Sequence, residues 1–258
     1  MIENHPVVSG AEPFFFKGNQ IGILISHGFV GTPQSVKYLG EQLASQGYTV
    51  YGVRLIGHGT HFKDLENCHY QDWIQDLEKG FRFLQQYCSE IFVIGQSMGG
   101  TLTLNLCASF PEVKGAILIN AAIKTIPVME GYRNKQKPRF IEEVEPDIKA
   151  QDVYEITYLK TPLHAIKQLL SLMDHTVEKL FSVKCPILAF QSIEDHVVPP
   201  ENTDYIMTNV QSRDKKVIPL FHSFHVASMD NEKEFIAEQC CQFIEKNASK
   251  TGTLNSFR

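Results

Sequence analysis

One serine stands where its hydroxyl could serve as a nucleophile. Residues 95–99 read GQSMG, after the apolar run at residues 91–94 and before residues 101–108, TLTLNLCA. The short β-branched run predicts a buried strand, and the residues after the serine have the length and small side chains of a helix on a sheet. A serine at such a corner fits G-x-S-x-G, in which a strained backbone lifts the hydroxyl above the sheet. We therefore expect Ser97 to be a catalytic nucleophile.

A serine hydroxyl needs a base at neutral pH, and the base needs a group that fixes its tautomer. Of the ten histidines, His225 fits best, because it follows the expected last strand in a loop that precedes a helix. His222, three residues earlier, is the main alternative. His58, His61 and His69 come too early for the chain order of this type of serine corner.

The acid that orients the base should follow another late strand. Asp195 follows the apolar residues 186–190 by a short turn, and Glu194 is its rival. The order Ser97, Asp195, His225 is nucleophile, acid, base, which is the order expected after a G-x-S-x-G corner.

Acyl transfer also needs N–H donors for the negative oxygen that forms on the attacked carbonyl. The backbone N–H of Met98, next to the nucleophile at a helix start, is one candidate. The loop after the first buried strand should supply the other, which indicates Phe29. We expect both side chains to line the acyl pocket, and His27 to stabilise its loop rather than to take part in catalysis.

The elements that must position these residues alternate regularly along the chain. Continuous apolar runs predict strands at residues 21–26, 48–54, 91–94, 114–120, 186–190 and 216–220. Helical patterns occupy residues 34–46, 70–87, 101–108, a stretch opened by Thr161 and Pro162, and residues 231–245. The alternation predicts the α/β class, with a mostly parallel central sheet and helices on both faces. Pro219 places the last strand near an edge, and Trp73 is expected in the core.

The pattern breaks between residues 121 and 182. Residues 124–152 are polar and poor in strand signals, and an apolar stripe follows from Leu163. A loop this long inside a compact domain is usually functional or mobile. We expect a single domain over residues 1–258 with a small cap inserted at about 121–182; the alternative is a plain surface excursion with a crossover helix.

Composition narrows the class of protein. The 258 residues carry a net charge of −5 and a pI near 6.1, which gives no electrostatic reason to expect nucleic acid or an anionic membrane as a partner. The six cysteines lack metal-site spacing, and we expect no metal or organic cofactor and a reducing compartment. The first twenty residues lack a signal or membrane pattern, so we expect a cytoplasmic protein without stable membrane insertion; the oligomeric state stays open. Residues 247–258 are expected to be frayed.

Five segments together resemble a known group of enzymes. They are HGFVGTP, LIGHGT, GQSMGG, EDHVVPP and HSFHVASMD, and the likeness runs from about residue 9 to residue 246. They resemble the bacterial monoacylglycerol lipases and small carboxylesterases of the α/β-hydrolase superfamily. The resemblance implies an α/β-hydrolase fold and a triad of Ser97, Asp195 and His225. It also implies that Phe29 and Met98 are the oxyanion donors, under a small mobile cap over an acyl tunnel.

Two positions qualify the resemblance. Gln96 stands where these enzymes commonly have leucine, so the packing beside the nucleophile is open to change. Glu155 falls on the stretch where the lipases place a glutamate that binds the glycerol hydroxyls, which implies a substrate-binding role. The alternative for Glu155 is an ordinary solvated surface carboxylate.

The resemblance and the residues together predict a serine hydrolase of carboxylic esters. The expected substrates are monoacylglycerols, cleaved to glycerol and fatty acid through an acyl-enzyme. A broad-specificity short-chain carboxylesterase is the nearest alternative. A non-enzymatic ligand receptor on the same fold is a further one, although such a receptor would usually lack a triad member.

Overall fold

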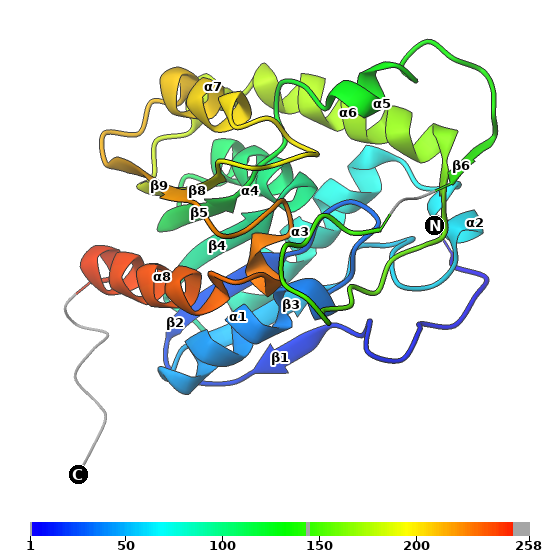
Figure 1. The fold of residues 1–258 in the computed structure, drawn as a ribbon. Helices are drawn as coiled ribbons and strands as arrows, with labels where there is room; N and C mark the ends of the chain where they lie inside the picture. The colour runs from blue at the N-terminus through cyan, green and yellow to red at the C-terminus, as the bar shows by residue number, and fades with distance from the viewer. Residues whose placement is uncertain (1, 143–144, 250–258) are drawn as a thin grey trace.

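A twisted central sheet with helices on both faces forms the body of the molecule (Figure 1). In this computed structural model, residues 2–142 and 145–249 are described. The sheet has the strand order β1-β3-β2-β4-β5-β8-β9. Its strands are β1 (Phe14–Phe16), β2 (Ile21–Ser26), β3 (Thr49–Val53), β4 (Glu90–Gln96), β5 (Gly115–Ile119), β8 (Ile187–Ser192) and β9 (Lys215–Leu220). All pairings are parallel except that of β1 with β3, which confirms the predicted α/β class and mostly parallel sheet.

Helices cover the two faces and bury two separate apolar cores. The helices are α1 (Gln34–Ser45), α2 (Phe62–Leu65), α3 (Tyr70–Leu84), α4 (Met98–Ser109), α5 (Pro127–Glu130), α6 (Leu163–Val177), α7 (Glu201–Asn209) and α8 (Lys233–Asn247). Successive side chains of a strand point to opposite faces, so Ile23 and Ile25 pack under α1 and α8 while Leu24 faces α3 and α4. Helix α4 is buried on nearly all sides, because the sheet, α3 and α6 surround it.

Two predictions about single residues are confirmed. Trp73 on α3 is fully buried, in the core on the α4 side of the sheet. Strand β9 lies at the sheet edge opposite β1, and its exposed Pro219 pairs in register with Gln191. A proline is tolerated there because an edge strand has one side without a ladder partner.

The structure differs from the prediction at several elements. Strand β1 was not predicted, since three consecutive phenylalanines carry no alternation of apolar and polar residues. The helix expected to open at Thr161 begins at Leu163; the two residues before it belong to β7 (Lys160–Pro162), which pairs antiparallel with β6 (Phe140–Glu142). Pro162 has an extended ψ of 134° and serves as the N-cap residue. Helix α7 was also missed.

Residues 121–182, which we call the cap segment, contain α5, β6, β7 and α6. In Figure 1 this segment lies at the upper right and then descends across the front of the molecule. Its first residues are fastened by Asn202, whose side-chain oxygen accepts the backbone N–H groups of Ile123, Lys124 and Thr125. The division of the chain into a sheet domain and a cap stays a prediction.

The C-terminal stretch is more ordered than expected over its first residues. Helix α8 extends to Asn247, and the backbone N–H of Ser249 donates to Oε2 of Glu90 at 2.9 Å. The expectation of fraying was therefore wrong for residues 247–249, and its remainder, residues 250–258, lies outside the described residues. In the part of the chain that is described, we find no helix with the length and apolarity to span a membrane.

Candidate active site

Ser97 occupies the sharp corner between β4 and α4. Its backbone has φ 54° and ψ −118°, a strained conformation for a residue with a side chain. The corner closes only because its neighbours are glycines. A Cβ atom on Gly95 would lie 2.0 Å from the carbonyl oxygen of Gly99, and one on Gly99 would lie 2.4 Å from that of Ser26. The strand-corner-helix arrangement predicted around Ser97 is present.

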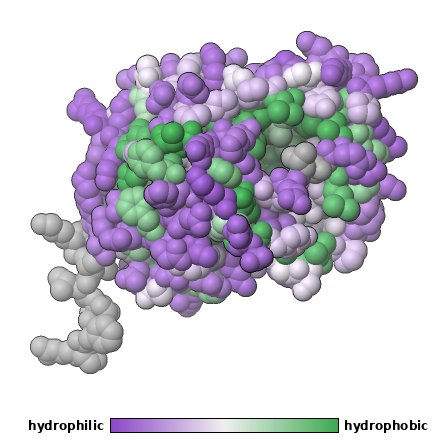
Figure 2. Space-filling view, in the orientation of Figure 1, coloured by the Kyte–Doolittle hydropathy of each residue, from purple (hydrophilic) through white to green (hydrophobic). Residues whose placement is uncertain are grey.

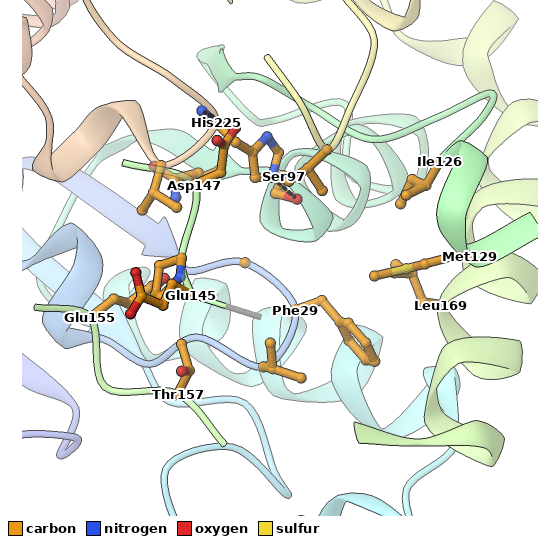
Figure 3. A pocket seen from close by; sticks show the side chains of 16 residues that line it. Phe29, Ser97, Ile126, Met129, Glu145, Asp147, Glu155, Thr157, Leu169 and His225 are labelled. Carbon is orange, nitrogen blue, oxygen red and sulfur yellow. Dashed lines mark hydrogen bonds between the residues drawn. The ribbon is translucent and has the colours of Figure 1, made fainter. Parts of the chain in front are cut away.

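The structure brings Ser97, His225 and Asp195 together from three separate segments. Oγ of Ser97 lies 2.9 Å from Nε2 of His225 (Figure 3), and Nδ1 of His225 lies 2.8 Å from Oδ2 of Asp195. The carboxylate fixes the proton on Nδ1, so Nε2 is left free to accept the proton of Ser97. The other oxygen of Asp195 accepts the N–H groups of Val197 and Val198, which hold the carboxylate in place.

The rival residues lie elsewhere. Glu194 has a side chain that is 57% exposed and forms an ion pair with Lys149 at 2.6 Å. His222 is exposed on the loop that carries His225. His27 stabilises its loop as predicted: its Nδ1 lies 2.8 Å from the carbonyl oxygen of Gly28, and its Nε2 accepts the N–H of Leu55.

His225 carries a raised pKa. Burial alone would lower the pKa of this imidazole, but the charge of Asp195 and its hydrogen bond raise it, with further contributions from Asp147 and Glu155. The net result is a pKa above the ordinary value of 6.5. The imidazolium that forms when His225 takes a proton is thus stabilised by carboxylates on more than one side.

The two residues expected to hold the oxyanion differ in where their side chains lie. Both stand beside Ser97: Met98 is the first residue of α4, and Phe29 follows Gly28, where an added Cβ would lie 3.3 Å from Cβ of Ser97. The Phe29 side chain lines the pocket, as expected. The Met98 side chain does not; it is fully buried in the core that also contains Trp73 of α3. That expectation was wrong because a residue at N1 of a helix lying on a sheet directs its side chain into the core.

A pocket opens at Ser97 and encloses about 730 Å³ of empty space, part of it continuous with solvent. Figure 3 shows two unlike sides. Ile126, Met129, Leu169 and Phe29 form an apolar side, and Glu145, Glu155 and Thr157 form a polar side, with Ser97 between them. Figure 2 shows this pocket as a hollow on the face of the molecule seen in Figure 1. Hydrophobic surface below α5 and α6 borders the hollow.

Glu155 is buried rather than solvated, so the alternative of a surface carboxylate is wrong. Only 6% of the residue is exposed, and burial raises the pKa of its carboxyl to about 7. Gly31 makes room for it, since a Cβ there would lie 2.8 Å from Oε1 of Glu155. The backbone on either side is held by one side chain: Gln34 donates to the carbonyl oxygen of Tyr154 and accepts the N–H of Ile156.

Several residues that fasten the site were not predicted. Asn120, at φ 46° after β5, donates to the carbonyl oxygen of His225 at 2.9 Å and accepts the N–H of Ser192. Buried Asp230 accepts N–H groups from Phe224 and from Lys149 of the cap segment. These residues join the loop after β9 to the sheet and to the cap segment. The sequence carries only a weak signal for these fastening residues, such as the polar Asn120 directly after an apolar strand.

The contacts of Gln96 explain how a polar residue is accommodated next to Ser97. The similar enzymes commonly have leucine at this position. The side chain is buried, and its Oε1 accepts the N–H of Ser228 at 3.2 Å. It therefore ties the corner at Ser97 to the turn that follows His225. Within the described residues, no cluster of three or more His, Cys, Asp or Glu side chains is arranged to hold a metal ion.

Comparison with known proteins identifies the family. The family model described as Serine aminopeptidase, S33, matches residues 19–232. A thermostable monoacylglycerol lipase of Bacillus sp. (strain H-257) is 43% identical over 249 residues, covering 96% of this chain and 100% of that protein. A carboxylesterase of Bacillus subtilis (strain 168) is 29% identical over 245 residues, covering 91% and 96%.

A solved structure from a study of two metagenome-derived lipolytic enzymes, LipS and LipT, superimposes with a TM-score of 0.90 at 41% identity, covering 93% of this chain and 100% of that one. The predicted resemblance and the predicted α/β-hydrolase fold are therefore confirmed. Since the family match and the 43% identical relative both extend over most of the chain, this protein belongs to the family of serine hydrolases described as Serine aminopeptidase, S33, in the α/β-hydrolase superfamily.

Proposed function

We propose that this protein hydrolyses carboxylic esters through an acyl-enzyme and that monoacylglycerols are its preferred substrates. The observation that carries the proposal is the division of the pocket at Ser97 into a polar side and an apolar side. A monoacylglycerol is divided in the same way, with two free hydroxyls at one end and an acyl chain at the other. The 43% identity to a monoacylglycerol lipase supports the same substrate class.

In the proposed reaction, Nε2 of His225 takes the proton of Ser97 while Oγ attacks the ester carbonyl carbon. The N–H groups of Met98 and Phe29 bind the carbonyl oxygen as it becomes negative, and the start of α4 adds a favourable dipole. Asp195 orients His225 and stabilises its charged form. His225 then protonates the departing glycerol oxygen, and a water molecule, activated by the same base, releases the fatty acid from Ser97.

Glu155 is the proposed acceptor for the glycerol hydroxyls. A carboxylate can accept two hydrogen bonds at once, and its bonds are stronger when it is charged. Because its pKa is about 7, the carboxyl is mostly ionised above neutral pH. A simple alkyl ester offers it no hydroxyl, so the buried carboxylate gains no hydrogen bond from such a substrate beyond its interactions with Ser35 and His225, which disfavours that substrate.

The alcohol preference should depend on Glu155. Replacing Glu155 with alanine is expected to lower the ratio of kcat/KM for 1-lauroylglycerol to kcat/KM for methyl laurate by about 10- to 100-fold, the effect of losing hydrogen bonds to a charged group. Both rates are measured by fatty acid release at pH 8, with each ester kept below the concentration at which it aggregates or separates from water.

Asp152→Asn is the matched control, because Asp152 is a carboxylate of the same stretch but is exposed and does not line the pocket. Its ratio should stay within about threefold of wild type, as expected for a solvated group. An unchanged ratio in Glu155→Ala would remove Glu155 from glycerol recognition. A wild-type ratio near unity would favour the broad-specificity carboxylesterase instead.

The pH dependence of the reaction should report the raised pKa of His225. Only the neutral imidazole can take the proton of Ser97, so activity rises as His225 loses its proton. Since its pKa lies above 6.5, kcat/KM for p-nitrophenyl butyrate is expected to rise through a midpoint above 6.5 and then to level off. A midpoint below 6.5 in the free enzyme would contradict the environment described for His225.

Two other activities are tested in the same assays. The family description names an aminopeptidase, so L-alanine p-nitroanilide serves as a peptidase substrate, and we expect much slower cleavage than for the esters. A ligand receptor would not react covalently. Labelling by a fluorophosphonate probe, which requires an activated serine, supports an enzyme, whereas the absence of labelling in folded protein favours a receptor.

A further inference from the structure

Asp147, in the cap segment, lies beside the proposed triad. It is on the stretch between β6 and β7, and its side chain is 15% exposed. It lines the pocket, but it contacts neither Ser97 nor the imidazole of His225 through any hydrogen bond found in the described residues. In Figure 3 Asp147 lies beside His225, and its carboxylate binds the main chain of the two loops that carry the acid and the base, together with the side chain of His196.

One carboxylate joins the two loops that bear the acid and the base. Oδ2 of Asp147 accepts the backbone N–H of His225 at 3.1 Å and that of His196 at 3.1 Å. Oδ1 lies 2.8 Å from Nδ1 of His196. His196 directly follows Asp195, so the same side chain sets the spacing between the acid and the base.

The main chain around His225 is held from several directions. The carbonyl oxygen of Asp147 accepts the N–H of Val226 at 3.1 Å, so Asp147 binds two successive residues of the loop. Asn120 binds the carbonyl oxygen of His225 from the sheet side. An imidazole must reach Asp195 and Ser97 at once, and small displacements of such a residue cost much activity.

We propose that Asp147 is a positioning residue, which holds His225 at the distance from Ser97 and Asp195 that proton transfer requires. The proposal rests on the proposed ester hydrolysis and extends it. It makes the geometry of the base depend on the seating of the cap segment, because the residue that fixes the backbone of His225 belongs to that segment.

Asp147 also contributes charge. Together with Asp195 and Glu155, it raises the pKa of His225 against the effect of burial. Among the described residues, the charged or titratable groups nearby also include His196, Glu145, buried Asp230 and the ion pair of Lys149 with Glu194. Removal of the negative charge of Asp147 should therefore move the acid limb of the activity profile toward lower pH.

Two substitutions separate the hydrogen bonds from the charge. Asp147→Asn keeps an oxygen at the position of Oδ2 for both backbone N–H groups, and its amide can donate to Nδ1 of His196 in the other tautomer. It removes only the charge. Asp147→Ala removes both the side-chain hydrogen bonds and the charge. Asp152→Asn, an exposed position of the same segment with φ 60°, controls for loss of a distant charge.

The test measures kcat, KM and the pH profile with p-nitrophenyl butyrate, after circular dichroism has shown that each variant is folded. In Asp147→Ala, kcat should fall about 10- to 100-fold while KM changes less than about threefold. Asp147→Asn should restore kcat at pH 9 to within about threefold of wild type, with its acid limb at lower pH. Asp152→Asn should match wild type.

Three outcomes would overturn the proposal: wild-type kcat in Asp147→Ala, a rise of KM alone, or an Asp147→Asn variant as impaired at pH 9 as the alanine variant. A purely structural role in seating the cap would change KM and leave the pH profile in place. The proposed function fails separately, if wild-type protein itself does not hydrolyse the ester.

Discussion

Replacing Ser97 with alanine is expected to lower kcat/KM for p-nitrophenyl butyrate by roughly 10⁴- to 10⁶-fold, as loss of a serine nucleophile does in other hydrolases. The substitution deletes one oxygen, which lies 2.9 Å from Nε2 of His225, and leaves the strained φ of 54° unchanged. The melting temperature should therefore stay within a few degrees of wild type, by calorimetry. Initial rates at several enzyme concentrations give the loss of activity.

The fluorophosphonate probe provides the control for this variant. It should label wild-type protein at Ser97 and leave the folded alanine variant unlabelled. Ester hydrolysis above about 1% of the wild-type rate in the pure variant would contradict the role of Ser97, since an oxyanion site alone supplies far less than that.

Replacing Asp195 with asparagine should have the next largest effect, a loss of roughly 10³- to 10⁴-fold in kcat. Asp195 is 1% exposed at its side chain and accepts from Nδ1 of His225 at 2.8 Å. An amide nitrogen at that position would donate to Nδ1 and place the proton on Nε2. The imidazole could then no longer accept the proton of Ser97.

Glu194→Gln is the matched control for Asp195→Asn, because it removes the neighbouring carboxylate. Glu194 is more than half exposed and paired with Lys149, so its loss should change kcat less than about twofold. The assignment of the acid is wrong if the two variants are equally impaired, or if Asp195→Asn keeps more than a tenth of the wild-type kcat.

The strand-to-helix corner at Ser97 could be predicted because its signals are local. Strand, glycine, serine, glycine and helix follow one another within residues 90–109, and each has a steric reason that does not depend on the rest of the chain. The placement of Asp195 and His225 beside Ser97 could be predicted from their positions after late strands, since parallel strands end at one edge of a sheet.

The cap segment could not be predicted in the same way. Its residues 124–152 have no periodicity, and their path depends on contacts with distant residues such as Asn202 and Asp230. Asp147 lies 78 positions from the backbone N–H of His225 that it binds, and nothing in its local sequence indicates that contact. The burial of Glu155 could not be predicted either, because it depends on Gly31 leaving space for the Glu155 carboxyl.

The two contacts of Gln34 on either side of Glu155 have a consequence for redesign. They fix the main chain at Tyr154 and Ile156, so the conformational entropy of this stretch is lost at folding rather than on substrate binding. Helix α5, which brings Met129 to the opposite side of the pocket, has no fully buried residue. Acyl-chain preference should therefore be adjustable by substitutions in α5 that leave alcohol selectivity intact, since distant sites with no shared partners act additively.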